Sequence, residues 1–259
     1  MFAGFNLELQ DVDFLRNDVD YFKIGKRHLS YQEKYCRESL EKYVTNGTID
    51  GTEIQEDWFP SIKTHVFISH SHTDYRLATE LAGWLNYTFG LKCFVDSNVW
   101  RYANDLLEMI NREYSDKRMV NGRTVYNHRK CNIASQHVNI MLLMALQKMI
   151  DKTEVIFLLN TPNSIPEYSE IYKTSTHSPW IYAEIVSSGL IRQRSKEAHR
   201  NVPIPIFETR ALDMKYKVDL RNFEDIGNSE LLYWESESCG RSPGLEMLDV
   251  LYEITGLNE

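Results

Sequence analysis

Short apolar runs alternate with longer amphipathic segments along much of the chain. Residues 65–68 are apolar and partly β-branched, and the polar stretch 69–74 follows them. This pattern is typical of a buried strand that leads into a loop. Apolar residues then recur with a helical period over 75–89, and residues 91–96 are predicted to form a second strand that ends in a polar residue. The segment 65–96 therefore predicts a β-α-β unit with two parallel strands.

The same alternation continues toward the C-terminus. Helices are predicted over 103–114 and 135–150, and residues 154–160 form the near-continuous apolar run of a strand buried on both faces. Ser178 and Pro179 predict the start of another helix, because serine is a good N-cap and proline suits the first helical turn. Strands and helices that alternate in this way predict an α/β fold with a flavodoxin-like, doubly wound parallel sheet.

The two ends of the chain read as extensions of this domain. Residues 1–62 are predicted to form a helical N-terminal extension, with a capping-box pattern at Ser30 and a helix over 31–43. Residues 211–259 form a C-terminal extension, whose terminal helix is expected to start at Ser242.

Between the extensions we expect one α/β domain over residues 63–210. Its last strand, 202–207, contains two prolines and is expected at an edge of the sheet, because proline cannot donate to a strand ladder. Residues 115–130 are basic and are expected to be irregular around an Asn-Gly turn. They belong to an insertion over about 114–140.

Composition and charge narrow the class of function. The 259 residues carry a formal net charge of -8, which argues against a nucleic-acid partner, since such proteins neutralise phosphates with Lys and Arg. The four cysteines form no C-x-x-C pair, and this fits a reducing cytoplasm better than a disulfide framework or a zinc site. The N-terminal residues do not resemble a signal peptide, and no apolar run approaches the roughly 20 residues that cross a bilayer. We expect a cytoplasmic protein without a membrane partner.

Ligands of doubly wound sheets bind beyond the carboxyl ends of the strands, which here are followed by the loops 69–74, 96–104 and 160–180. Asp96 stands at a predicted strand end, where it can bind a ribose hydroxyl or cap its own turn. The chain has neither a glycine-rich phosphate fingerprint nor a G-x-S-x-G nucleophile elbow. A bound nucleotide must therefore be held by other means.

The loop that follows the first predicted strand allows three interpretations. His70, His72 and Asp74 occupy alternate positions, as in the zinc loop of metallo-β-lactamase-type hydrolases, and zinc accepts imidazole and carboxylate ligands. Tyr75 stands where that family usually has a further histidine. The other two interpretations are a plain polar loop that caps the next helix and a loop that holds a small ligand.

A carboxylate and an indole lie one helical turn apart in the segment that begins at Ser178. Trp180 and Glu184 share a helix face at this spacing. A carboxylate beside an indole suits a cationic or electron-poor aromatic group, most strongly where water is excluded. The alternative is an ordinary solvated glutamate, because glutamate is a good helix former.

Four segments together resemble a TIR domain. Residues 66–71 (VFISHS) resemble its first strand, 91–96 (LKCFVD) its second strand with a terminal Asp, and 154–160 the strand before its long loop. Residues 178–184 (SPWIYAE) match the W-x-x-x-E pattern that carries the catalytic glutamate of NAD-cleaving members. The resemblance covers about 63–210 and implies a TIR-like fold. Two departures are the segment SNVWR after the second strand, where a glycine-containing segment is usual, and the insertion.

The resemblance implies an enzyme that breaks the nicotinamide–ribose bond of NAD, similar to the TIR component of Thoeris anti-phage defence systems. NAD is then the substrate rather than a cofactor, and no metal is expected. The product would be a cyclic ADP-ribose isomer or a conjugate, which signals to a separate nucleotide-sensing effector protein. Other TIR subunits are expected partners, since TIR active sites are often completed by a neighbouring subunit. Glu184 would be catalytic, and the expected substrate-binding residues are Phe67, Ser69, His70, Ser71, Asp96, Trp100 and Trp180. A non-catalytic TIR adaptor is the main alternative.

Overall fold

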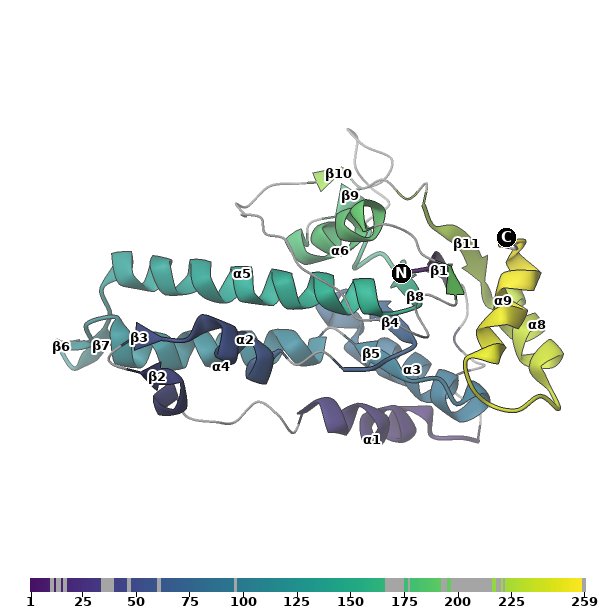
Figure 1. Ribbon diagram of the computed structural model, residues 1–259, viewed down its shortest axis with the longest axis horizontal. Coiled ribbons are helices and arrows are strands. Elements are labelled where there is room, and N and C mark those ends of the chain that lie inside the picture. The colour runs from purple at the N-terminus through teal and green to yellow at the C-terminus, as the bar shows by residue number, and fades with distance from the viewer. Residues whose placement is uncertain are drawn as a thin grey trace.

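The computed structural model describes residues 1–9, 12, 15, 18–33, 40–45, 48–59, 62–95, 97–165, 175–176, 178–191, 195–196, 216–217, 220 and 222–257. Within these residues, a five-stranded parallel sheet lies between helices on both faces (Figure 1). The strand order is β11-β1-β8-β4-β5. The strands are β1 (Ala3–Glu8), β4 (Val66–Ser69), β5 (Cys93–Val95), β8 (Val155–Leu159) and β11 (Glu224–Gly227). This arrangement confirms the predicted α/β fold with a flavodoxin-like, doubly wound parallel sheet.

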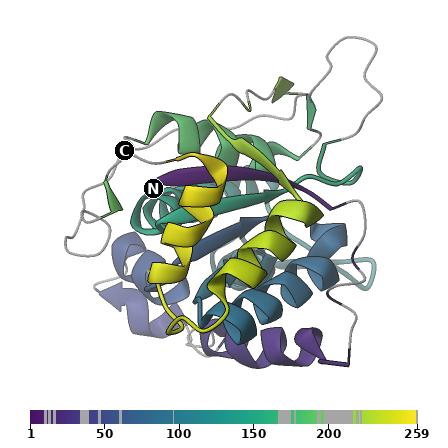
Figure 2. The ribbon, with the colours of Figure 1, turned by 90° about the vertical axis from the view of Figure 1, so that its right-hand side faces the viewer.

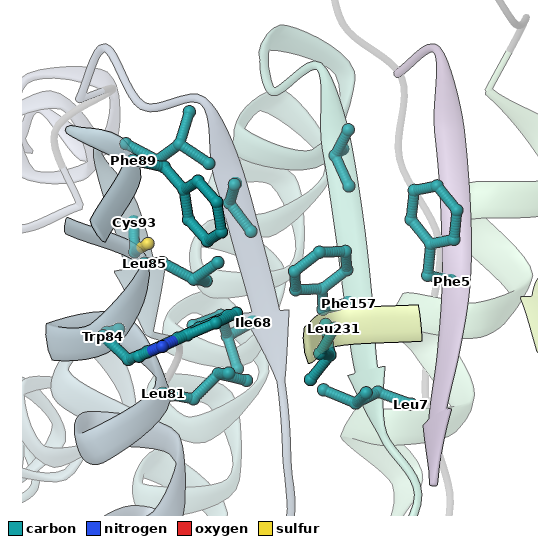
Figure 3. Close-up of a cluster of buried hydrophobic side chains, with 14 of the residues drawn as sticks. Phe5, Leu7, Ile68, Leu81, Trp84, Leu85, Phe89, Cys93, Phe157 and Leu231 are labelled. Atoms are coloured by element: carbon teal, nitrogen blue, oxygen red, sulfur yellow. The ribbon is translucent and has the colours of Figure 1, made fainter. Parts of the chain in front are cut away.

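Side chains of the strands alternate between two hydrophobic cores. Val66 and Ile68 of β4 face one core, and Phe67 between them faces the other. The first core contains the helices α1 (Tyr21–Glu33), α3 (Tyr75–Phe89), α8 (Asn228–Ser238) and α9 (Glu246–Thr255). Figure 3 shows Ile68, Phe157 and Phe5 in this core on three neighbouring strands, with Trp84 and Leu231 from the covering helices. The second core contains α5 (His128–Lys152) and α6 (Pro179–Leu190).

The first residues of the chain form an internal strand of the sheet. Strand β1 pairs in parallel with β8 on one side and with β11 on the other. The expectation that residues 1–62 form a helical extension is therefore wrong for the residues of β1. Phe5 and Leu7 are fully buried in the first core, so this strand is part of the domain's centre.

The other described residues of the N-terminal segment are largely helical, but their helices begin and end at other positions than predicted. The first three residues of the predicted 31–43 helix are the end of α1, residues 34–39 lie outside the described residues, and Ser30 lies inside α1. The Ser30 hydroxyl donates to the carbonyl oxygen of Arg27 at 2.7 Å, so it bonds within the helix instead of capping one. After α1 come a 3₁₀ turn at Leu40–Tyr43, the hairpin of β2 (Val44–Thr45) and β3 (Thr48–Ile49), and α2 (Gly51–Trp58).

A long pair of helices extends from the sheet (Figure 1). Helix α4 (Ser97–Tyr114) begins two residues after the end of β5. The segment 96–104, which was expected to be a loop, is therefore helical from Ser97. Helix α5 also starts seven residues before the predicted Ser135. Between the two helices, β6 (Arg118–Val120) and β7 (Arg123–Val125) form an antiparallel hairpin where an irregular segment was expected. Asn121 and Gly122 form its turn with φ values of 51° and 74°, the left-handed backbone that Asn-Gly turns favour.

The C-terminal segment also adds to the sheet. Strand β11 forms one edge of the sheet next to β1, and α8 and α9 follow it (Figure 2). The predicted terminal helix is confirmed as α9, although it begins at Glu246 rather than Ser242. The predicted strand 202–207 lies outside the described residues. Two further short strands, β9 (Ser175–Thr176) and β10 (Tyr216–Lys217), pair near α6.

Candidate functional site

The chain direction in the sheet reverses between β4 and β8. From β4 the chain passes through α3 to β5 on one side, and then through α4 and α5 to β8 on the other side of β4. Ligands of doubly wound sheets bind at such a switch point, beyond the carboxyl ends of the two strands. The loop after β4 and the loop after β8 meet at this edge.

Ser69 ends β4 and points toward α6. Side chains alternate along a strand, so Ser69 faces the same side as Phe67, which is the side covered by α5 and α6. Ser69 is fully buried, and its hydroxyl donates a hydrogen bond to the Oε2 atom of Glu184. Two of the residues named from the sequence are thus in direct contact, although 115 positions separate them.

Glu184 lies on the buried face of α6. The helix begins as predicted: the Ser178 hydroxyl accepts from the Ile181 N–H at 3.3 Å, and Pro179 occupies the first turn. Four buried residues of α6 have the spacing of a single helix face: Ile181, Glu184, Ile185 and Ser188. The carboxylate therefore stands where an amphipathic helix normally places an apolar side chain.

The burial of Glu184 separates it from ordinary surface glutamates. Its side chain has no exposed surface, so the alternative of a solvated helix glutamate is wrong. Burial of a carboxylate costs free energy, and polar bonds such as the one from Ser69 offset only part of that cost. A group retained against such a cost is a candidate for function.

His70 follows Ser69 at the end of the strand and is also buried. Its Nδ1 atom lies 3.4 Å from the Ile68 carbonyl oxygen. Ser71 is half-buried and immediately precedes the 3₁₀ turn η3 (His72–Asp74). The structure thus places the residues of the expected substrate-binding loop at the edge of the sheet, with Ser69 and His70 inside the protein.

The loops after β4 and β8 are joined by Asp74. The Thr161 hydroxyl donates to its Oδ2 atom at 2.5 Å, and the Asn163 side-chain amide donates to its Oδ1 atom at 2.8 Å. Sequence reasoning named both loops but missed Thr161 and Asn163 as individual residues. In the sequence, only their position shortly after an apolar strand indicates that these two residues could belong to the site.

The aromatic residues expected at the site have packing roles where the structure describes them. Phe67 is fully buried in the second core, with its ring centroid 5.2 Å from that of Phe94. Trp180 is half-buried and packs against a third cluster, which contains Trp58 and Leu106. Asp96 and the side chain of Trp100 lie outside what the structure describes.

The geometry gives no support to the zinc interpretation of the loop after β4. His72 is exposed while His70 is buried, and both carboxylate oxygens of Asp74 accept bonds from Thr161 and Asn163. Among the described residues, which include these three, no group of three or more His, Cys, Asp or Glu side chains is placed to hold a metal ion.

None of the described helices has the length and apolar character needed to span a bilayer. Comparisons of the chain with protein-family models, with curated proteins and with solved structures find no match.

Proposed function

We propose that this protein is an NAD-cleaving enzyme of the TIR type. It breaks the nicotinamide–ribose bond and forms an ADP-ribose-derived signalling nucleotide, a cyclic ADP-ribose isomer or a conjugate, in anti-phage immunity. The observation that carries the proposal is the buried carboxylate of Glu184, held by the Ser69 hydroxyl at the switch point of the sheet.

A single carboxylate is sufficient for this reaction. Nicotinamide is bound in NAD as a pyridinium and leaves as a neutral molecule, so its departure needs no general acid. The transition state resembles an oxocarbenium ion, as in other glycosyl cleavages. A fixed negative charge beside the ribose stabilises that developing cation, and burial strengthens the interaction because water does not screen it.

The other residues of the site have supporting roles in this proposal. Ser69 orients the carboxylate through its hydroxyl, and His70 with the half-buried Ser71 lies where the ribose or pyrophosphate would bind. Asp74 ties the loop after β8 to the loop after β4. If water is kept from the ribosyl cation, a nucleophile of the nucleotide or of a second molecule captures it, and cyclisation or conjugation follows. If water enters, the product is ADP-ribose.

The arrangement of the fold supports the same proposal. Strands β5, β4 and β8 lie in this order in the sheet, with helix α6 after β8. The four segments that resemble a TIR domain contain β4, β5, β8 and the start of α6. Because the three strands are parallel, their carboxyl ends lie at one edge of the sheet. The product would act on a separate nucleotide-sensing effector protein, in the cytoplasm.

The test is nicotinamide release from NAD by the full chain, with products identified by mass spectrometry. Glu184→Gln keeps the size of the side chain and removes its charge, so turnover is expected to fall at least about 100-fold. Glu253→Gln changes an exposed glutamate on α9 and is the matched control, expected to keep full activity. Circular dichroism of both variants checks that they are folded. Full activity of a folded Glu184→Gln variant would reject the assignment.

The same assay separates the alternatives. A non-catalytic adaptor releases no nicotinamide at any protein concentration, including crowded conditions that drive self-association. A zinc hydrolase contains stoichiometric zinc, which elemental analysis of the purified protein would detect.

A further inference from the structure

Two exposed regions lie at opposite ends of the long axis of the molecule (Figure 1). One is the end of the α4–α5 helix pair, residues 116–130, which we call the arm tip. The other is the exposed side of α8, which lies on the other side of the sheet (Figure 2). The two regions differ in charge, and both expose large apolar side chains.

The arm tip is basic and apolar. Lys117, Arg118, Arg123, Arg129 and Lys130 outnumber its one acidic residue, Asp116, on a chain whose net charge is -8. Its large apolar side chains are unusually exposed: Met119 by 66%, Val120 by 50% and Val125 by 46%. An isolated two-stranded hairpin is only marginally stable in water, so apolar side chains on its surface would gain from a covering partner.

The register of the hairpin gathers two of these valines with two arginines. Arg118 pairs with Val125 and Val120 pairs with Arg123 across the strands, and directly paired residues share a face. One face of the hairpin therefore presents two apolar side chains beside two guanidinium groups. Interface cores of proteins favour this combination of apolar and arginine side chains.

The exposed side of α8 has the complementary character. Ser229, Leu232, Tyr233 and Ser236 are exposed and follow a helical spacing, with Leu232 exposed by 47% and Tyr233 by 55%. The segment that carries them, residues 222–241, holds five acidic residues and one arginine. The acidic residues are Glu224, Asp225, Glu230, Glu235 and Glu237. We call this region the α8 face.

We propose that the arm tip of one copy of this chain docks on the α8 face of a second copy. Valines would pack against Leu232 and Tyr233, and the arginines would lie beside the carboxylates and over the tyrosine ring. A second copy is favoured over a nucleic acid or an anionic membrane because the chain itself supplies the complementary surface. The exposed apolar side chains would also make no favourable contact with a phosphate backbone.

This contact joins two different surfaces, and each copy carries both. It can therefore repeat from copy to copy and form open chains or a closed ring. The proposal does not rest on the NAD-cleaving function, since none of its residues lies at the end of β4.

The test uses two variants of the full chain, each with one surface disabled. The tip variant carries Val120→Asp and Val125→Asp, and the face variant carries Leu232→Asp and Tyr233→Asp. Sedimentation velocity of the wild type is expected to show masses above the monomer that increase with protein concentration and fall at high salt, because the attraction is partly between exposed charges. Each variant alone is expected to stay monomeric, and circular dichroism verifies that it is folded.

The decisive sample is a one-to-one mixture of the two variants. The intact tip of the face variant can dock on the intact face of the tip variant, so the mixture is expected to form dimers and nothing larger. A wild type that stays monomeric at all concentrations and low salt would overturn the proposal, whether or not it binds RNA or anionic vesicles. Dimers of the face variant alone would indicate a tip-to-tip contact and would overturn it as well, as would a mixture that stays monomeric.

Discussion

Two helix pairs of this protein, α1–α3 and α4–α5, are built in different ways. Helices α1 and α3 approach each other closely at two glycines: a Cβ atom on Gly83 would lie 1.9 Å from the Tyr21 carbonyl oxygen, and one on Gly25 would lie 2.0 Å from that of Thr79. Helices α4 and α5 meet through larger side chains such as Leu106 and Val138. They continue beyond the sheet to the arm tip (Figure 1).

Because they are built differently, the two helix pairs have different roles in the protein. Backbone contact keeps α1 close to α3, and both helices contribute to the first core, α1 with Leu29 and α3 with Trp84. The α4–α5 pair has its own smaller cluster, to which Tyr43 and Trp58 of the N-terminal segment also belong. One pair therefore stabilises the domain, while the other carries an exposed surface away from it.

The largest expected loss of stability comes from Gly83→Ala. The added methyl group overlaps the Tyr21 carbonyl, so the two helices must separate or shift, at a cost of more than about 3 kcal/mol. Urea denaturation measures the free energy of unfolding. Gly51→Ala is the matched control, because no atom lies within 4 Å of the added Cβ, and its effect should stay within about 1 kcal/mol. Equal midpoints for the two variants would contradict the close approach of α1 and α3.

Leu106→Ala should have the next largest effect. Leu106 is fully buried between the arm helices, and the variant is expected to lose about 2.5 kcal/mol, near the low end for such changes because the arm can partly collapse around the cavity. Hydrogen exchange should show faster opening of α4 and α5 while α1 and α3 keep their protection. Uniform loss of protection across the whole chain would show that the arm is not a separate unit of stability.

A smaller, pH-dependent effect is expected at His28 of α1. Its Nε2 atom accepts from the Cys93 N–H at 3.0 Å, and burial, with nearby Lys92, lowers the pKa of His28 below its ordinary value of 6.5. The unfolded chain then binds the proton more readily than the folded one, so stability is fully present above pH 6.5 and is lost as the pH falls toward the folded pKa. Thermal unfolding of wild type and His28→Gln across this range measures the effect. Identical pH dependence in both proteins would exclude His28 as the cause.

The smallest effect on stability is expected at the arm tip. Met119 is exposed, so Met119→Ser should change the free energy of unfolding by no more than about 0.5 kcal/mol. Urea denaturation of dilute, monomeric protein is the measurement. A loss comparable to that of Leu106→Ala would mean that the tip packs against the rest of the chain.

Part of the candidate site could be predicted from local sequence. Ser69 follows an apolar run, and Glu184 lies in a helix whose start is encoded by Ser178 and Pro179. Their mutual contact could not be predicted, because it depends on how α6 packs on the sheet. The bonds of Asp74 to Thr161 and Asn163 depend in the same way on two loops that meet only after β4 and β8 have paired.

The sequence of the arm tip contains an indication of a hairpin, although an irregular segment was predicted there. Asn121-Gly122 between short runs with Val120 and Val125 is a strong indication of a two-residue hairpin turn. The many basic residues around it favoured an irregular segment instead. Charge affects how a segment interacts with solvent or with a partner, but it does not determine the conformation of the backbone.

Local sequence specifies the types of most elements between β4 and α6, because hydrophobic periodicity and helix caps act over a few neighbouring residues. The position of β1 between β8 and β11 depends on tertiary packing, since parallel pairing joins residues far apart in the chain and leaves no local pattern that identifies the partner. The burial of Glu184 depends on tertiary packing as well. A glutamate has the same helical preference on either face, and the side on which it lies depends on what the helix packs against.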